Sequence, residues 1–184
     1  MVYPIVVYGS PLLRKVSEEI SPDDPELKTL IDDMFETMYV SDGVGLAAPQ
    51  IGKNLRLFVI DGTPMKEDDP SLEGFKKAFI NPEILNEDGD EWAFTEGCLS
   101  LPNIREDIYR PETVTIRYFD ENFKEYEETY DGIKARIIQH EYDHLDGILF
   151  VDKLTPLKKK LLRGKLNDIA KGKSKAAYKT KVVK

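Results

Sequence analysis

The chain has 184 residues, of which 41% are hydrophobic, and this composition is enough for one core of ordinary domain size. Its N-terminal residues lack the basic start and the long apolar run of a signal peptide. No stretch is long and apolar enough for a membrane span, so we expect a cytoplasmic protein without a membrane partner. The net charge of -8 hides an asymmetry, because residues 153–184 carry twelve Lys or Arg and one acid. Residues 1–152 therefore carry a net charge of -19. This acidic body argues against nucleic-acid binding, whether general or sequence-specific.

A helix is the first predicted element, because apolar residues recur at helical spacing from Leu27 to Met38. Asp24 and Pro25 suit the N-cap and the first helical position, and Gly43 marks the end. Four β-rich runs follow, at residues 55–61, 77–85, 113–120 and 124–130. The last two flank a short turn, which predicts an antiparallel hairpin. Residues 62–76 are rich in Asp, Pro, Gly and Glu and predict a surface loop.

Helical periodicity returns over residues 131–146, and another helix is expected to begin near Thr155, with Pro156 in its first turn. Strands in runs, without regular alternation with helices, favour an α+β fold. We expect antiparallel sheets packed around a central helix, residues 131–146, and a C-terminal helix. The chain shows no internal linker, so we predict a single catalytic domain over residues 1–170, followed by a basic, flexible tail over residues 171–184.

The run QHEYDH at 139–144 holds both histidines of the chain. His140 and His144 are four residues apart, about 40° around a helix axis, so both imidazoles lie on one face at a spacing that suits one metal ion. Glu141 is placed to hold a metal-bound water without being a ligand itself. The HExxH pattern is rare by chance, and it favours a metal site over an amphipathic helix with two ordinary histidines.

The third ligand does not follow the common extensions of HExxH. Phe150 stands where metzincins have their third histidine, and no glutamate follows Glu141. The chain has one cysteine, so an intramolecular disulfide is excluded. A lone cysteine is usually a small buried hydrophobe, but beside an incomplete HExxH we favour a ligand role for it. The candidates are therefore Cys98 as a thiolate and, as carboxylates, Asp146, Asp152 and Asp168.

Three segments resemble, in order and spacing, the motifs of the peptide deformylase family of bacteria and organelles: GVGLAAPQ at 43–50, EGCLSLP at 96–102 and QHEYDHLDG at 139–147. GVGLAA also fits a dinucleotide fingerprint, but it follows a helix and Pro49 would block the helix that should come next. The resemblance implies removal of the N-formyl group from the formylmethionine of nascent peptides, with release of formate.

The resemblance also implies one divalent ion per chain, with Fe²⁺ as the native metal and Zn²⁺ or another divalent ion possible after purification, bound by Cys98, His140 and His144. Glu141 would move protons, and Gln50 and the Leu99 backbone N–H would stabilise the oxyanion. Glu96 is expected to be structural and paired with Arg110. Substrate-binding residues are expected to be Val44, Gly45, Gly97, Ile133 and Ile137.

Two other functions are compatible with these patterns. An HExxH metallopeptidase acting on other peptide bonds would cleave peptides that lack a formyl group, and a non-enzymatic protein with a structural metal would need a fourth protein ligand. The Lys-rich C-terminal segment is usual for a solvated surface, and it can also dock on the RNA phosphates of a ribosome.

Overall fold

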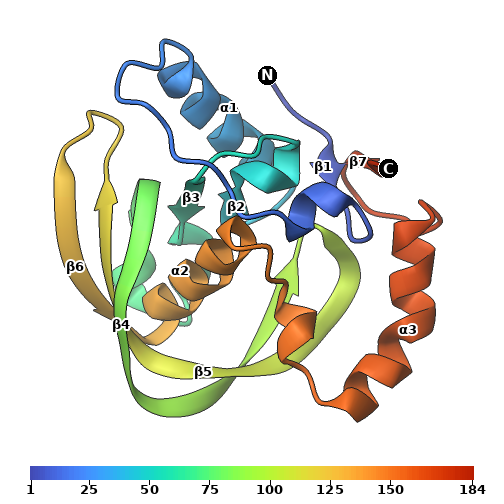
Figure 1. The fold of residues 1–184 in the computed structure, drawn as a ribbon. Helices are drawn as coiled ribbons and strands as arrows, with labels where there is room; N and C mark the ends of the chain where they lie inside the picture. The colour runs from blue at the N-terminus through green and yellow to red at the C-terminus, as the bar shows by residue number, and fades with distance from the viewer.

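The computed structural model describes all 184 residues and has the predicted α+β architecture (Figure 1). The helices are α1 (Leu27–Val40), α2 (Gly132–Leu145) and α3 (Pro156–Ala170). The strands are β1 (Ile5–Val6), β2 (Gly45–Ala47), β3 (Leu57–Asp61), β4 (Lys76–Cys98), β5 (Leu101–Phe119), β6 (Glu125–Asp131) and β7 (Thr180–Lys181).

One antiparallel sheet has the strand order β2-β3-β4-β5-β6. The long strands β4 and β5 curve around α2, which lies at the centre of the molecule (Figure 1). Four register shifts interrupt their pairing, and such irregularities let a long ladder bend. The curved sheet therefore wraps the central helix, as the sequence predicts.

The predicted strand 77–85 is only the first part of β4, and the predicted strand 113–120 is the last part of β5. The rest of β4 includes a charged and fully exposed run at residues 87–91, which lacks the alternation by which a half-buried strand is recognised. The predicted hairpin is confirmed, with pairing that runs from Thr113↔Asp131 to Phe119↔Glu125.

Helix α1 begins two residues later than the sequence predicts. The Asp24 carboxylate accepts a hydrogen bond from the Glu26 backbone N–H at 2.9 Å, so Asp24 and Pro25 form a turn before the helix. The predicted loop 62–76 contains two short 3₁₀ turns, and it places Leu72 fully in the core.

Helix α2 is buried continuously from Ala135 to Glu141, which is why its polar residues must find partners inside the protein. Ile138 at its middle is fully buried and contributes about 1.5–3 kcal/mol to the free energy of unfolding. One side of α2 packs on the sheet in the cluster that contains Phe58, Phe79 and Ile116. The other side carries the histidines.

The chain beyond α3 returns to the body, where β7 pairs in parallel with β1. The sequence predicts a flexible tail here; in the structure these residues make hydrogen bonds with the backbone of Ile5 and Val7 and with the side chain of Ser10. None of the three helices combines the length and the apolar character that a membrane crossing requires.

Candidate metal centre

A cavity of about 490 Å³ lies between α2, β2 and the turn that joins β4 to β5. This volume is in the usual range for sites that bind small ligands. Its wall contains most of the residues that the sequence singled out, namely Val44, Gly45, Gln50, Gly97, Cys98, Leu99, Ile137, His140 and Glu141.

Cys98, His140 and His144 come together beside this cavity, with one ligand atom from each lying within 4.8 Å of the others. Cys98 is the last residue of β4, and the histidines are one turn apart on α2. The Sγ of Cys98 lies 3.4 Å from Nε2 of His144. Tetrahedral zinc forms bonds of about 2.3 Å to sulfur and 2.0–2.1 Å to nitrogen, so a sulfur and a nitrogen ligand of the same ion lie about 3.5 Å apart. The donor set therefore fits a divalent ion.

The carboxylate alternatives for the third ligand have other partners. Asp152 accepts two hydrogen bonds from Arg14, at 2.6 and 3.1 Å, and Asp146 pairs with Arg56 at 2.9 Å. Asp168 lies on the exposed face of α3. These positions leave Cys98 as the candidate that lies beside both histidines.

Glu96 organises the buried charges behind the centre. It accepts two hydrogen bonds from Arg110, at 2.8 and 3.0 Å, which confirms the predicted pairing, and one from Arg136 at 3.0 Å. Its Oε1 lies 2.8 Å from Nδ1 of His140. Since an ionised carboxylate can only accept, Nδ1 of His140 carries the proton and Nε2 faces the cavity as a potential ligand.

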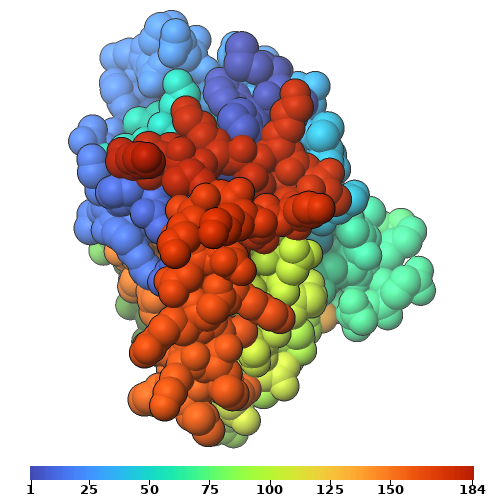
Figure 2. Space-filling view, turned by 90° about the vertical axis from the view of Figure 1, so that its right-hand side faces the viewer, coloured from blue at the N-terminus to red at the C-terminus, as the bar shows by residue number.

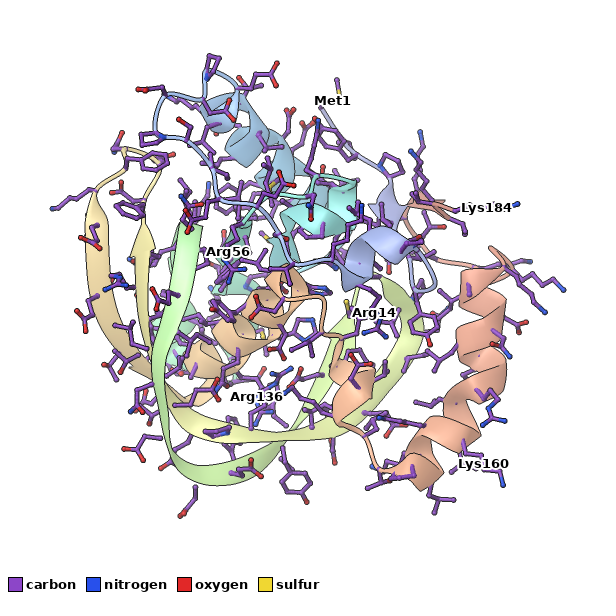
Figure 3. The ribbon with its side chains drawn as sticks, in the orientation of Figure 1. Met1, Arg14, Arg56, Arg136, Lys160 and Lys184 are labelled. Atoms are coloured by element: carbon purple, nitrogen blue, oxygen red, sulfur yellow. The ribbon has the colours of Figure 1, made fainter.

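Arg136 closes this network from α2, where it lies between the helix and the curve of β5 (Figure 3). Its guanidinium donates to the backbone carbonyls of Ile108 and Trp92 at 2.7 and 2.6 Å, and it lies 4.7 Å from the Trp92 ring centroid. The network therefore ties α2 to both long strands. No pattern in the sequence indicates Arg136 in this position.

The electrostatics of the centre favour a cation at the histidines. Burial would raise the pKa of Glu96, but hydrogen bonds with His140 and Arg110 lower this pKa well below its usual value, so Glu96 is ionised. Burial lowers the pKa of His144, which keeps its imidazole neutral and able to bind a metal. Burial would also lower the pKa of His140, but hydrogen bonds with Cys98 and Glu96 raise it, so this position attracts positive charge.

Glu141 has a different environment from Glu96. Burial raises its pKa to about 7, and its Oε2 has no hydrogen-bond partner within the chain. Glycine at position 45 makes this packing possible, because a Cβ there would lie 2.6 Å from Oε1 of Glu141. The sequence predicts a substrate-binding role for Gly45, and the structure adds this steric one.

Gln50 is buried, and its orientation follows from its hydrogen bonds. The Ala47 backbone N–H donates to Oε1 at 2.9 Å, so the amide nitrogen must point the other way. That nitrogen donates to Oγ of Ser100 at 3.1 Å and lies 3.5 Å from Sγ of Cys98. The backbone N–H of Leu99 makes no hydrogen bond within the chain. The Leu99 N–H is therefore unpaired beside the centre, whereas the two hydrogens of the Gln50 amide point to Ser100 and Cys98.

Ile133 is the one predicted substrate residue that the cavity wall does not include. It comes one helical turn, about 6 Å, before Ile137 on α2, and it packs against the core cluster on the sheet side. Three further residues on the wall come from parts of the chain where no sequence pattern indicates a site: Met65 from the loop, Arg105 from β5 and Tyr178 near the C-terminus.

Comparison with known proteins identifies close relatives. The family model of polypeptide deformylases matches residues 2–160. The peptide deformylase of Flavobacterium psychrophilum is 52% identical over an alignment that covers 100% of this chain and 98% of that protein. The crystal structure of a peptide deformylase from Legionella pneumophila is 42% identical, with a TM-score of 0.81 over 93% of this chain and 96% of that one. The peptide deformylase of Thermus thermophilus is 40% identical, with a TM-score of 0.83 over 94% of this chain and 99% of that one.

Proposed function

The chain belongs to the peptide deformylase family, which removes the N-formyl group from nascent peptides, and we propose that Cys98, His140 and His144 hold the metal ion on which this reaction depends. The observation that carries the proposal is the convergence of these three donors at the wall of a cavity that also contains Glu141. Three protein ligands leave a coordination position open, as catalytic sites require. When held by Cys98, His140 and His144, a divalent ion would supply an activated water, with a pKa near about 7, and Lewis-acid polarisation of the formyl group.

Glu141 acts as the proton carrier. Its carboxylate takes a proton from the water that attacks the formyl carbon, and it gives this proton to the amide nitrogen as the carbon–nitrogen bond breaks. Formate and a free amine result. A pKa of about 7 suits both steps, because a group that titrates near the working pH can accept and donate with little cost.

Gln50 and Leu99 provide the donors for the negative charge that develops on the formyl oxygen. The amide nitrogen of Gln50 is fixed by the hydrogen bond on its opposite end, and the Leu99 N–H has no competing partner. Donors that are already oriented need no rearrangement during the reaction, and one such donor contributes roughly 3 kcal/mol in comparable sites.

The substrate binds along the open edge of β2 in this proposal. β2 is the terminal strand of the sheet, so its outer edge can pair with an extended peptide through the backbone of Gly45. Gly97 lies across the cavity at the end of β4. The apolar side chains of Val44 and Ile137 form one wall of the slot for the methionine side chain, while Ile133 supports it from the core.

A direct assay tests this proposal. Purified protein should release formate from formyl-Met-Ala-Ser, lose this activity with a chelator, and regain it when a divalent metal is restored. Mass spectrometry of unformylated peptides provides the control, because an HExxH peptidase would cleave their internal bonds. Cleavage of those peptides without formate release would contradict the proposal.

Fe²⁺ is the native metal in this proposal. A Cys/His₂ set suits iron and zinc alike, and affinity in the ordinary divalent series favours zinc. Zinc would therefore replace iron after oxidation of an Fe²⁺–thiolate centre with an open coordination position during purification. Metal analysis of protein purified without oxygen should find iron, and zinc alone in such a preparation would contradict this assignment.

We also propose that the basic face of α3 docks on ribosomal RNA, where formylated substrates emerge. Leu162, Leu166 and Ile169 face the body, and α3 exposes several basic side chains around them: Lys159, Lys160, Arg163 and Lys165, together with Lys158, which also pairs with Glu106 at 3.5 Å. Clustered cations of this kind attract RNA phosphates. The charge of the body disfavours such contact elsewhere.

A further inference from the structure

The C-terminal segment, residues 173–184, lies across one face of the body between the N-terminal residues and α3 (Figure 2). Ile5 and Val7 donate backbone hydrogen bonds to the carbonyls of Lys179 and Lys181, at 2.9 and 3.1 Å. The backbone N–H of Val183 donates to Oγ of Ser10 at 3.0 Å. These bonds place the segment beside the turn that carries the metal ligand from β4.

That turn, residues 98–103, is held from two sides. On the N-terminal side, Oγ of Ser100 donates to the Val6 carbonyl at 2.7 Å, and the Tyr8 N–H donates to the Ser100 carbonyl at 2.8 Å. On the C-terminal side, the hydroxyl of Tyr178 donates to the Leu99 carbonyl at 2.7 Å.

A second contact comes from the same C-terminal segment. The side-chain amide of Asn103 donates to the Lys175 carbonyl at 2.7 Å. Asn103 and Tyr178 both line the cavity, so the segment reaches the wall of the site itself.

We infer that Tyr178 is a positioning residue for deformylation, and that residues 173–184 form one side of the active site by fixing Leu99 through its carbonyl. This inference rests on the proposed function, in which the Leu99 N–H stabilises the developing oxyanion.

The geometry explains why such support is needed. The Leu99 N–H has no hydrogen bond within the chain, so its direction depends on how the rest of the residue is held. The carbonyl carbon of Leu99 is two bonds from the amide nitrogen, and a bond from Tyr178 restricts rotation of the whole residue. A displacement of about 1 Å in a catalytic group can cost on the order of 100-fold in rate.

Tyr178 suits this role chemically. It is half-buried, and burial together with the nearby charge of Cys98 raises its pKa to about 12, so the hydroxyl keeps its proton across the neutral range. A hydroxyl that stays protonated can donate to the carbonyl throughout catalysis. A phenylalanine in its place would fill the same space without this bond.

The first test is Tyr178→Phe in the zinc-loaded protein, with Tyr109→Phe as the matched control, since Tyr109 is exposed on β5 and does not line the cavity. For Tyr178→Phe we expect kcat to fall about 10-fold with KM within about 2-fold, as for a group that acts in the transition state. The amide resonance of Leu99 should shift in the NMR spectrum, whereas the metal content should remain one ion per chain.

Tyr109→Phe should match the wild type in every measurement. The inference is overturned if Tyr178→Phe keeps wild-type kcat and the Leu99 resonance does not move. Failure of the wild type to release formate would instead reject the proposed function, so the two failures are distinguishable.

Deletion of residues 173–184 provides the second test. If the shortened protein folds and binds metal, its kcat on a short formyl peptide should fall at least as far as that of Tyr178→Phe. Wild-type turnover by the folded deletion protein would contradict a role for the segment in the site. If the deletion prevents folding, the Tyr178→Phe result decides.

Discussion

The carboxylates of Glu96 and Glu141 lie on either side of His140 and have opposite environments. Glu96 is surrounded by two arginines and the imidazole, so it stays ionised and orients His140. Glu141 is buried without a hydrogen bond to its Oε2, and its pKa rises to about 7. Two residues of the same chemical kind thus have different surroundings, which suit Glu96 to a structural role and Glu141 to the proposed proton transfer.

Glu141→Gln should separate proton transfer from metal binding. The amide keeps the size of the side chain but cannot accept the proton, so formate release should fall by at least about 100-fold while the metal content stays at one ion per chain. Glu127→Gln on the exposed face of β6 is the matched control and should be fully active. Near wild-type formate release by metal-loaded Glu141→Gln would contradict the assignment of the base.

Cys98→Ser tests the thiolate ligand. Serine retains the shape of the side chain but is a poor ligand for zinc or ferrous iron, so competition with a chelator should show metal affinity at least about 10-fold weaker than that of the wild type. Turnover should be largely lost as well. Wild-type affinity in this variant would mean that the two histidines recruit another ligand.

At the scale of elements, the position of α2 depends on how β4 and β5 bend around it. The Glu96 network joins the three elements, because Glu96 lies on β4, Arg110 on β5 and Arg136 on α2. Breaking one partner of a buried charge network commonly costs about 3–5 kcal/mol, because the remaining charges lose their compensation. The proposed metal ligands are therefore positioned by the same contacts that hold the sheet around the helix.

Two glycine substitutions separate helix propensity from backbone constraint. Gly164 lies inside α3 with open space around its Cβ position, so Gly164→Ala should raise the free energy of unfolding by about 0.5–1 kcal/mol. Gly147 has φ +73°, and a Cβ there would lie 2.5 Å from the Arg14 carbonyl oxygen. Gly147→Ala should lower the free energy of unfolding by more than about 1 kcal/mol. Urea unfolding measures both, and equal effects would contradict this account.

At the scale of the whole molecule, the charge is separated into an acidic body and a basic C-terminal region. Helix α3 lies on the side of the molecule that Figure 2 presents, below the C-terminal segment, and its basic residues are exposed. The same region of the chain therefore has two proposed roles. In these proposals, its cationic side chains would contact ribosomal RNA, and its last residues would support the active site.

Ribosome binding should depend strongly on salt, because contacts between cations and phosphates release counterions. Substituting Lys159, Lys160 and Arg163 with Gln should reduce co-sedimentation with ribosomes at low salt and lower the logarithmic salt slope by about 3. A triple variant on other surfaces, with Gln at Lys53, Lys66 and Lys124, is the charge-matched control. Equal pelleting by the two variants would show that α3 is not the docking element.

The sequence alone determined the parts of this protein that depend on local spacing. Helical geometry places His140 and His144 on one face whatever the rest of the fold does, and the periodicity of apolar residues predicted α1, α2 and the β5–β6 hairpin. Elimination among the possible third ligands, together with the three family motifs, favoured Cys98. These inferences required no knowledge of distant contacts.

Only the tertiary structure decided which distant groups surround the site. The length of β4 includes a charged, exposed run at residues 87–91 that is held in the strand by pairing rather than by its own pattern. The contacts of Arg136, Met65 and Tyr178 arise because the sheet curves and the chain end returns, and a side chain carries no mark of such an encounter in its own sequence neighbourhood. Ile133 shows the limit of helical spacing, since it lies one turn from Ile137 and packs against the same core cluster but stays outside the cavity wall.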